Sequence, residues 1–416
     1  MDTTSLADLM PRLRETYRDL HAHPELSFTE HRTAGLVAAW LRELGLTVTE
    51  GVGRTGVVGV LRRGDGPVVL LRADMDGLPV AEATGLPYAS SARGIDPEGR
   101  DVPVMHACGH DVHVTCLLGA VSVLAADASW SGTLVAVFQP AEEVAQGARA
   151  MVEDGLYDTV PRPDVVLGQH VAPIPAGTIG LRPGPSFAAT DSLRITLFGE
   201  GGHGSRPEAT VDPVVLAAAT ILRLQTVVSR EVAGTDTAVL TVGSVQAGTK
   251  SNIIPDEAVL LANLRTYDVR VREKALAAVT RIVEGEAATA GARRAPLVEP
   301  FEQSPAVVND PAGVERTRPA LEALVGAGRV VDPGPITGSE DVGVLAEAAD
   351  APCVFWLLGG ADPVAFAGAH DLAGIRAVLA SLPSNHSPLF APVIDPTLEL
   401  GVQALVGAAG SWLHHP

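Results

Sequence analysis

The sequence predicts a two-domain α/β protein in which one domain is inserted into the other. Its 416 residues exceed the ~100–200 residues that one domain usually holds. Short apolar runs typical of strands alternate with segments of helical periodicity. The middle of the chain repeats this alternation in an order of its own. We therefore expect a discontinuous domain, residues 1–184 and 300–416, and an inserted domain, residues 185–299.

The inserted segment predicts a ferredoxin-like domain, because its elements follow the order β-α-β-β-α-β. Strand-like runs lie at residues 191–200, 237–245, 256–268 and 295–300, and helical runs at 212–231 and 271–288.

The outer segments predict the helices and the buried strand of a mixed-sheet domain. Helical periodicity marks residues 5–23, 32–45, 114–126 and 398–413, and residues 351–360 are typical of a buried strand. Ser27 and Glu30 have the spacing of a capping box before the second helix, and Asp111 is a candidate N-cap of the third.

Charge and composition argue against nucleic acid and membranes as partners. The 49 acidic side chains outnumber the 30 basic ones, and the formal charge of −19 repels phosphate groups. We find no apolar run near the ~18 residues of a membrane span, and "MDTTSLADLM" lacks the pattern of a signal peptide. A cytoplasmic location is expected. The three cysteines, Cys108, Cys116 and Cys353, are expected to be reduced.

The stretch "MHACGHDVH", residues 105–113, gathers side chains that bind metal ions. Because Gly109 separates Cys108 from His110, both can turn toward one centre from a loop at a helix start. The alternative is a helical face made by His106, His110 and His113, which Gly109 disfavours. His106 and His113 are therefore expected to have structural or supporting roles.

Metal-ligand side chains also follow three apolar runs, at Asp74 and Asp76, at Glu142 and Glu143, and at His170. Open α/β sheets place their sites beyond such strand ends, although an isolated acidic residue there is commonly a helix cap. Adjacent glutamates suggest a division of labour, in which Glu143 binds a metal ion and Glu142 takes a proton from water. An ordinary acidic helix start after Pro140 is the alternative.

One glycine pattern is misleading. "GVGRTG", residues 51–56, fits a dinucleotide motif, but a strand-like run follows it where a helix is needed, so we expect a turn between strands. The sequence contains no phosphate-binding P-loop and no nucleophile elbow. Hydrolysis by an activated water is the leading mechanism.

Several motifs in order resemble the M20 metallopeptidase and amidohydrolase family. They are "LLRADMDGLP", "MHACGHDVH", "FQPAEE", "GQH", "GGHGSRP", "SNIIPDE", "LRTYD", "GSEDVG" and "NHSPLF". The branch most similar contains hippurate hydrolases, N-acyl-L-amino acid amidohydrolases and auxin-conjugate hydrolases. The resemblance runs from "LHAHPELSFTE" to "NHSPLF" and so covers nearly the whole chain.

This resemblance implies a zinc-peptidase-like catalytic domain that binds two divalent metal ions, with Glu142 as general base. The implied ligands are Cys108, His110, Glu143, His170 and His386, with the Cys108 thiolate bridging the ions. Zinc suits these donors best, and manganese, cobalt or nickel stay open. Where many members have His-x-Asp, this chain has Asp74 and Asp76; we expect Asp76 to orient a ligand and leave Asp74 unassigned.

The resemblance also implies that the inserted domain is a lid and dimerisation domain. Asn252 and Arg265 would hold a substrate carboxylate, and His203, from the other subunit of a homodimer, would polarise the scissile carbonyl. A turn asparagine and a surface arginine are the alternatives. The expected activity is hydrolysis of N-acyl amino acids, small-molecule substrates, through a metal-activated water. A dipeptidase or carboxypeptidase with the same centre, or a non-catalytic binder of acyl amino acids, stays open.

Overall fold

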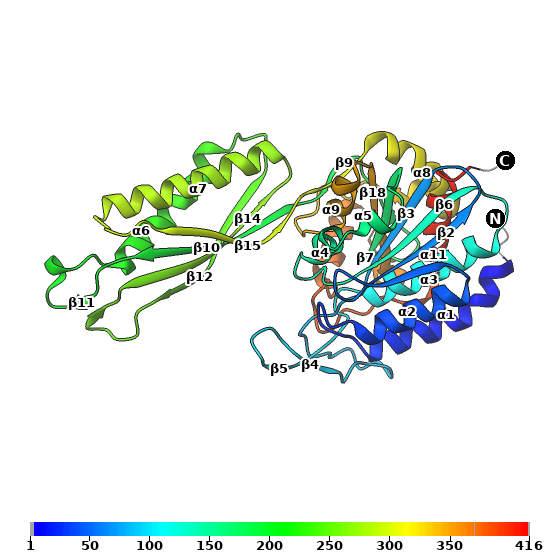
Figure 1. The fold of residues 1–416 in the computed structure, drawn as a ribbon, viewed down its shortest axis with the longest axis horizontal. Coiled ribbons are helices and arrows are strands. Elements are labelled where there is room, and N and C mark those ends of the chain that lie inside the picture. The colour runs from blue at the N-terminus through cyan, green and yellow to red at the C-terminus, as the bar shows by residue number, and fades with distance from the viewer. Residues whose placement is uncertain (1–3, 370, 415–416) are drawn as a thin grey trace. The chain divides into compact units, whose positions relative to one another are not determined.

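The computed structural model describes residues 4–369 and 371–414. The first three residues of "MDTTSLADLM" lie outside the described residues. The chain forms two compact units, which are described separately (Figure 1). Unit 1 comprises residues up to Ser186, Val307–Gly334 and the residues from Asp341 onward. Unit 2 comprises Phe187–Ala306 and Pro335–Glu340.

Unit 1 is built on an eight-stranded mixed sheet, which confirms the predicted mixed α/β class. In sheet order its strands are β1 (Thr47–Val52), β2 (Gly56–Arg63), β6 (Gly132–Gln139), β3 (Val68–Asp74), β7 (Val165–Pro175), β18 (Cys353–Ala361), β8 (Ile179–Gly180) and β17 (Val330–Val331). The four strands β6, β3, β7 and β18 run parallel. They are buried almost throughout, as expected where helices cover both faces of a sheet.

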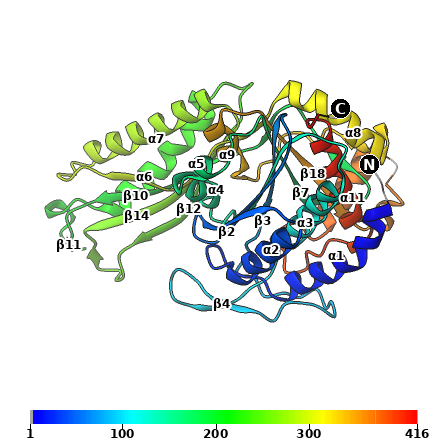
Figure 2. The same cartoon turned by 45° about the vertical axis from the view of Figure 1, so that its right-hand side comes forward.

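The helices of unit 1 are α1 (Thr4–Ala22), α2 (His31–Glu43), α3 (His110–Ala126), α4 (Gly147–Glu153), α5 (Leu156–Thr159), α8 (Pro311–Val325), α9 (Val342–Ala349), α10 (Leu372–Ser381) and α11 (Ile394–Gly410). Helix α3 contacts β3 and β7 and also packs against α1, α2 and α11 (Figure 2). Helices α4 and α9 contact each other and, respectively, β6 and β7. Short elements complete the unit: β4 (Arg93–Ile95), β5 (Asp101–Pro103), β9 (Gly184–Phe187), β16 (Val307–Asn309), η3 (Ala327–Arg329) and η4 (Pro363–Phe366).

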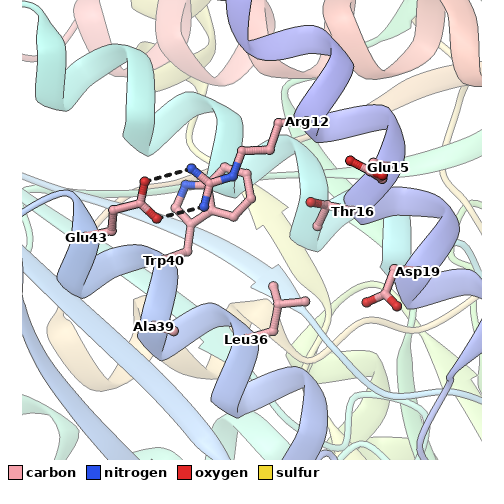
Figure 3. A pocket seen from close by; sticks show the side chains of 8 residues that line it. All are labelled: Arg12, Glu15, Thr16, Asp19, Leu36, Ala39, Trp40 and Glu43. Atoms are coloured by element: carbon pink, nitrogen blue, oxygen red, sulfur yellow. Dashed lines mark hydrogen bonds and ion pairs between the residues drawn. The ribbon is translucent and has the colours of Figure 1, made fainter.

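A surface groove between α1 and α2 shows how these helices are joined (Figure 3). The Arg12 guanidinium lies 3.6 Å from the centre of the Trp40 ring. It also donates two hydrogen bonds to Glu43, of 2.9 and 2.8 Å. By stacking on Trp40 and pairing with Glu43, Arg12 of α1 binds two residues of α2.

Two predicted helix caps are wrong. Helix α2 begins at His31 without a side-chain cap, because Ser27 donates to Asp76 instead and Glu30 is turned into the interior. Helix α3 begins one residue before Asp111, with Gly109 as its N-cap in the left-handed conformation. At α2 the predicted capping residues have partners elsewhere in the fold, and at α3 a glycine takes the N-cap position.

Unit 2 has a four-stranded antiparallel sheet in the order β12 (Ala238–Ala247), β14 (Glu257–Thr266), β10 (Ala189–Phe198) and β15 (Leu297–Ser304). Helices α6 (Pro213–Thr226) and α7 (Val269–Thr289) pack with this sheet around a separate apolar core. The smaller elements are β11 (Gly202–His203), β13 (Ile253–Ile254), η1 (Pro207–Ala209) and the π-helical turn η2 (Val227–Glu231).

One helix of unit 2 differs from the expectation that no segment could span a membrane. Pro213–Glu231 is long and apolar enough by length and composition alone. Its Leu216, Ala217 and Leu224 side chains are buried in the core of unit 2. The core helix of a globular domain passes the same test for this reason.

Candidate metal centre

The carboxyl ends of two neighbouring strands bring acidic residues to one edge of the unit 1 sheet. Strands β3 and β6 are parallel neighbours that end at Asp74 and Gln139. Asp76 follows the first strand, and Glu142 and Glu143 follow the second after a short turn. His170 lies on the next strand, β7, which continues beyond it to Pro175. The prediction that the strand ends before His170 is therefore wrong, because the paired backbone extends further than its apolar run.

Cys108 and His110 lie where a loop enters α3. Gly109 has φ +80°, and a Cβ atom there would lie 2.3 Å from the Val171 side chain, so glycine is required. His110 is the first residue of the helix, and Cys108 precedes it in the loop. The Cys108 sulfur lies 3.4 Å from Nε2 of His170.

The donor atoms gather into two overlapping groups that share Cys108. One contains Cys108, His110 and His170, and the other contains Cys108, Glu143 and His386; within each group the ligand atoms lie within 4.8 Å of one another. Nε2 of His386 is 3.2 Å from the Glu143 carboxylate. The structure thus brings together all five side chains that the family resemblance implies as ligands.

Two atoms of this cluster have no hydrogen-bond partner within the described part of the chain. They are Nε2 of His110 and Oε1 of Glu143, which are both buried and lie 3.7 Å apart. Buried polar atoms rarely go unsatisfied in native structures. Unpaired nitrogen and oxygen donors beside a thiol fit a bound cation, because they are ligand atoms of zinc-type sites.

Two of the five donors, Cys108 and His110, hold their protons more tightly than usual, whereas burial lowers the pKa of His170 well below its usual value. Burial, reinforced by the neighbouring Glu143 and Glu142, raises the pKa of Cys108 well above its usual value. Burial opposes the charge on His110, but Asp74 and Asp76 outweigh it and raise the pKa of His110 to about 10. Metal binding would therefore release protons from both side chains.

Asp76 ties the donors together. Its Oδ1 lies 3.2 Å from Nδ1 of His110 and accepts from the backbone N–H of Glu142 at 3.1 Å. Its Oδ2 accepts from the backbone N–H of Glu143 at 3.0 Å and from the Ser27 hydroxyl at 2.7 Å. This carboxylate can orient one imidazole and two glutamates at once, the kind of role predicted for it.

The remaining histidines of the stretch 105–113 are arranged differently. Nδ1 of His113 lies 2.5 Å from Asp74, and its Nε2 accepts from the backbone N–H of Val171 at 2.8 Å, so both ring nitrogens are used. Asp74 also accepts from Arg72 at 2.7 Å. His106 is buried, belongs to no donor group found among the described residues, and has no hydrogen-bond partner there.

Sequence reasoning missed Asn385. Its amide nitrogen donates to the Cys108 carbonyl at 3.3 Å and to the Val171 carbonyl at 3.1 Å, and it lies 3.7 Å from the Cys108 sulfur. The amide therefore joins the cysteine loop to Val171 in β7. Its place beside His386 in "NHSPLF" was the available signal.

The three predicted substrate residues lie in unit 2, at two separate places. His203 pairs with Ile253, and the backbone N–H of Gly204 donates to the Asn252 carbonyl at 2.9 Å, so His203 and Asn252 are neighbours. Arg265 lies near the other end of β14 and donates to Asn263 and Ser339. The eight residue-to-residue steps of extended strand from 257 to 265, each about 3.4 Å, span about 27 Å.

A sulfur, imidazole and carboxylate cluster beside a further carboxylate at a sheet edge defines a metal-dependent hydrolase. Residues 70–374 match the model of peptidase family M20/M25/M40, and the chain belongs to this family. The predicted family and enzyme class are therefore confirmed.

Curated relatives of known name are similar over most of their length. Hippurate hydrolase of Campylobacter jejuni subsp. jejuni is 42% identical over 282 residues, which cover 67% of this chain and 71% of the relative. N-acetylcysteine deacetylase of Bacillus subtilis is 39% identical over 303 residues, 72% of this chain and 76% of the relative. Thermostable carboxypeptidase 1 of Saccharolobus solfataricus is 36% identical over 365 residues, 86% and 87% of the two chains.

A solved structure has the same fold. The Bacillus subtilis YxeP protein, described as a dinuclear metal-binding peptidase of the M20 family, is 30% identical with a TM-score of 0.74. The similarity covers 97% of this chain and 98% of that one.

Proposed function

We propose that the protein removes the acyl group from N-acyl amino acids by metal-dependent hydrolysis of the amide bond. The observation that carries the proposal is the sharing of Cys108 between two donor groups, with Glu142 close by. Glu142 lies 3.9 Å from Nε2 of His110 and does not belong to either cysteine group. Relatives named as hippurate hydrolase and N-acetylcysteine deacetylase support this substrate class.

Two divalent cations would be held by the five donors, and Cys108 belongs to both donor groups. One would take His110 and His170, and the other Glu143 and His386. Zinc suits thiolate, imidazole and carboxylate together, while manganese, cobalt and nickel are the alternatives. When bound, the cations supply Lewis acidity, which acidifies water and polarises a carbonyl oxygen.

Glu142 is the proton carrier in this proposal. Asp76 holds its backbone N–H, so the side chain projects from a fixed point. Its carboxylate would accept a proton from the attacking water and deliver it to the leaving amine nitrogen. Glu143, directed to the donor group of His386, would stay a ligand throughout.

Unit 2 would serve as the ferredoxin-like lid and dimerisation domain. Its element order and antiparallel sheet support the ferredoxin-like assignment, with residues 185–299 as the predicted domain. Exposed apolar side chains on α6, namely Val214, Val215 and Leu222, support an interface with a second subunit in a homodimer.

The separation inside unit 2 refines the predicted substrate contacts. Arg265 would hold the substrate carboxylate, while His203 and Asn252, about a strand length away, would both come from the second subunit. The backbone N–H of Ser205 donates to Nδ1 of His203 at 3.1 Å. A neutral His203 therefore carries its proton on Nε2, where it can donate to the developing oxyanion.

A cytoplasmic location is part of the proposal, since a reducing compartment keeps the Cys108 thiol available. A carboxypeptidase that cleaves peptide bonds at the same centre is the second candidate, favoured by the thermostable carboxypeptidase relative.

The test is a substrate panel. The protein is stripped with a chelator, reloaded with zinc or manganese, and assayed with hippurate, N-acetylcysteine, other N-acetyl amino acids and dipeptides. We expect kcat/KM for an N-acyl amino acid to exceed that for every dipeptide. A dipeptide preference would favour the carboxypeptidase, and no turnover with any metal would leave a non-catalytic binder of acyl amino acids.

A further inference from the structure

The turn that presents Glu142 and Glu143 has an unfavourable backbone. Ala141 and Ala145 have φ angles of 51° and 52°, which residues other than glycine rarely adopt. Such a conformation persists only where its surroundings hold it. The backbone N–H of Gly147 closes the turn on the Ala141 carbonyl at 3.1 Å.

Two buried carboxylates hold three consecutive backbone N–H groups of this turn. The N–H of Ala141 donates to Oε1 of Glu30 at 2.9 Å. The next two, from Glu142 and Glu143, donate to Asp76 at 3.1 and 3.0 Å. Glu30 thus does for the first residue of the turn what Asp76 does for the two glutamates.

Glu30 is itself fixed on both of its oxygens. It is fully buried, and Oε1 also accepts from the backbone N–H of Phe28, another residue with positive φ, at 2.9 Å. Its Oε2 accepts from the Thr55 hydroxyl at 2.5 Å. The carboxylate therefore joins the segment before α2 to the glutamate turn.

The glycine-rich stretch 51–56 supplies Thr55 and packs against the same loop. It is the turn between β1 and β2, as predicted. A Cβ atom on Gly56 would lie 3.1 Å from Pro140, and one on Gly53 would lie 2.6 Å from the backbone of Met151. Glycine allows this close approach to Pro140, just before the glutamates, and to Met151 of α4, which follows them.

We propose that Glu30, held by Thr55, is a positioning residue that fixes the backbone of residues 141–143. This backbone directs Glu142 to proton transfer and Glu143 to metal binding. This inference rests on the proposed function and extends it to the segment before α2. Hydrogen bonds to three consecutive N–H groups fix the backbone of residues 141–143, and this backbone sets the direction in which each glutamate side chain leaves the chain. Glu30 acts through that backbone and belongs to none of the donor groups of the described chain.

The test compares Glu30→Ala with a matched control, Glu25→Ala. Glu25 lies five residues earlier and also accepts two backbone N–H groups, from Arg32 and Thr33 at 2.8 Å each, but these belong to α2. For Glu30→Ala we expect kcat to fall about tenfold or more, with KM within about threefold. Affinity for the second equivalent of zinc, measured by competition with a chelator, should fall about 10–100-fold. Glu25→Ala should keep both values within about twofold.

The conservative variant separates positioning from charge. Glu30→Gln keeps an oxygen that can accept from both Phe28 and Ala141, so it should keep at least about a third of the parental kcat. If Glu30→Ala does not fold, Thr55→Val replaces it, because this variant removes only the hydroxyl that braces Glu30. Thr55→Val should fold and lose kcat severalfold with KM unchanged.

Three outcomes would overturn the inference: parental kcat and zinc affinity in Glu30→Ala, equal losses in Glu25→Ala and Glu30→Ala, or parental kcat in a Thr55→Val that substitutes for an unfolded variant. Failure of the proposed function is distinguishable, because the parental protein would then turn over no N-acyl amino acid. The zinc competition would still measure what Glu30 does for Glu143.

Discussion

Two buried histidines in unit 1 have similar neighbours but differ in how many of their ring nitrogens are hydrogen-bonded. His21 and His110 are both fully buried and both face carboxylates. Nδ1 of His21 lies 2.7 Å from Asp111, and its Nε2 lies 3.0 Å from Glu82. His21 therefore forms a closed ion triad that joins α1 to the first turn of α3.

His110, one residue before Asp111, is left open. Its Nδ1 reaches Asp76, but its Nε2 is 3.7–3.9 Å from carboxylates of Asp74, Glu142 and Glu143 and hydrogen-bonds to none of them. The unbonded Nε2 of His110 and the carboxylates around it could together bind a cation. The His21 ring has both nitrogens hydrogen-bonded and contributes to the fold instead. The contrast separates a candidate ligand histidine, His110 at the start of α3, from a structural one, His21 in α1.

The largest effect that follows concerns the proton carrier. Glu142→Gln keeps the shape of the side chain and the backbone bond to Asp76 but loses the basic oxygen. Turnover of N-acyl amino acids should fall about 10²–10⁴-fold, while the zinc content stays parental. Steady-state kinetics and elemental analysis measure the two values. Parental turnover would remove Glu142 from the mechanism.

The next effect tests the open histidine. His110→Gln removes the unbonded Nε2, so we expect the zinc content to fall below two per subunit and the affinity to fall at least about 100-fold. Titration of the stripped protein with zinc, with a chromophoric chelator as competitor, gives both numbers. Full zinc occupancy at parental affinity would mean that the unbonded nitrogen is not a ligand.

The sequence could predict the donors that follow apolar runs, because these runs are visible in hydrophobicity, although β7 continues past His170. It could not predict His386 from physics alone. The residue lies in a loop with φ +72°, and its backbone N–H donates to the Ala107 carbonyl at 2.8 Å, a contact between segments 279 residues apart. Family resemblance supplied that residue, and geometry brings it to Glu143.

Errors in the prediction arose where a local pattern had a distant competitor. Ser27 and Glu30 have capping-box spacing, yet they hydrogen-bond to Asp76 and Ala141, and neither side chain caps α2. The same cause hid the positioning role of Glu30, whose partner is 111 residues away. Spacing alone also could not reveal that Asn252 lies beside His203, a contact made through the pairing of β11 with β13.

A smaller effect tests the closed triad through its pH dependence. Burial disfavours the charge on His21, but Asp111 and Glu82 outweigh it and raise the pKa of His21 to about 10. The unfolded value is about 6.5, so this stabilisation is complete below pH 6.5 and is lost as the pH rises toward 10. In the metal-free protein, His21→Gln should cost about 3–5 kcal/mol at pH 6 and clearly less at pH 9.5, as measured by urea unfolding.

The opposite trend, with a difference that grows as the pH rises, would mean that His21 is neutral in the folded protein. A loss that does not change between the two pH values would mean that packing, and not charge, explains its cost.

The smallest effect sharpens the comparison, because His113 belongs with His21 although it stacks on His110, with ring centres 5.3 Å apart. His113 also falls in a donor group with Asp74 and His110, but both of its nitrogens are already bonded, to Asp74 and to the Val171 N–H. His113→Gln should cost about 1–3 kcal/mol of stability and leave two zinc ions per subunit. Urea unfolding and elemental analysis decide the matter, with His110→Gln as the matched variant. Loss of zinc from His113→Gln without loss of stability would show that satisfied nitrogens do not distinguish structural from ligand histidines in this helix.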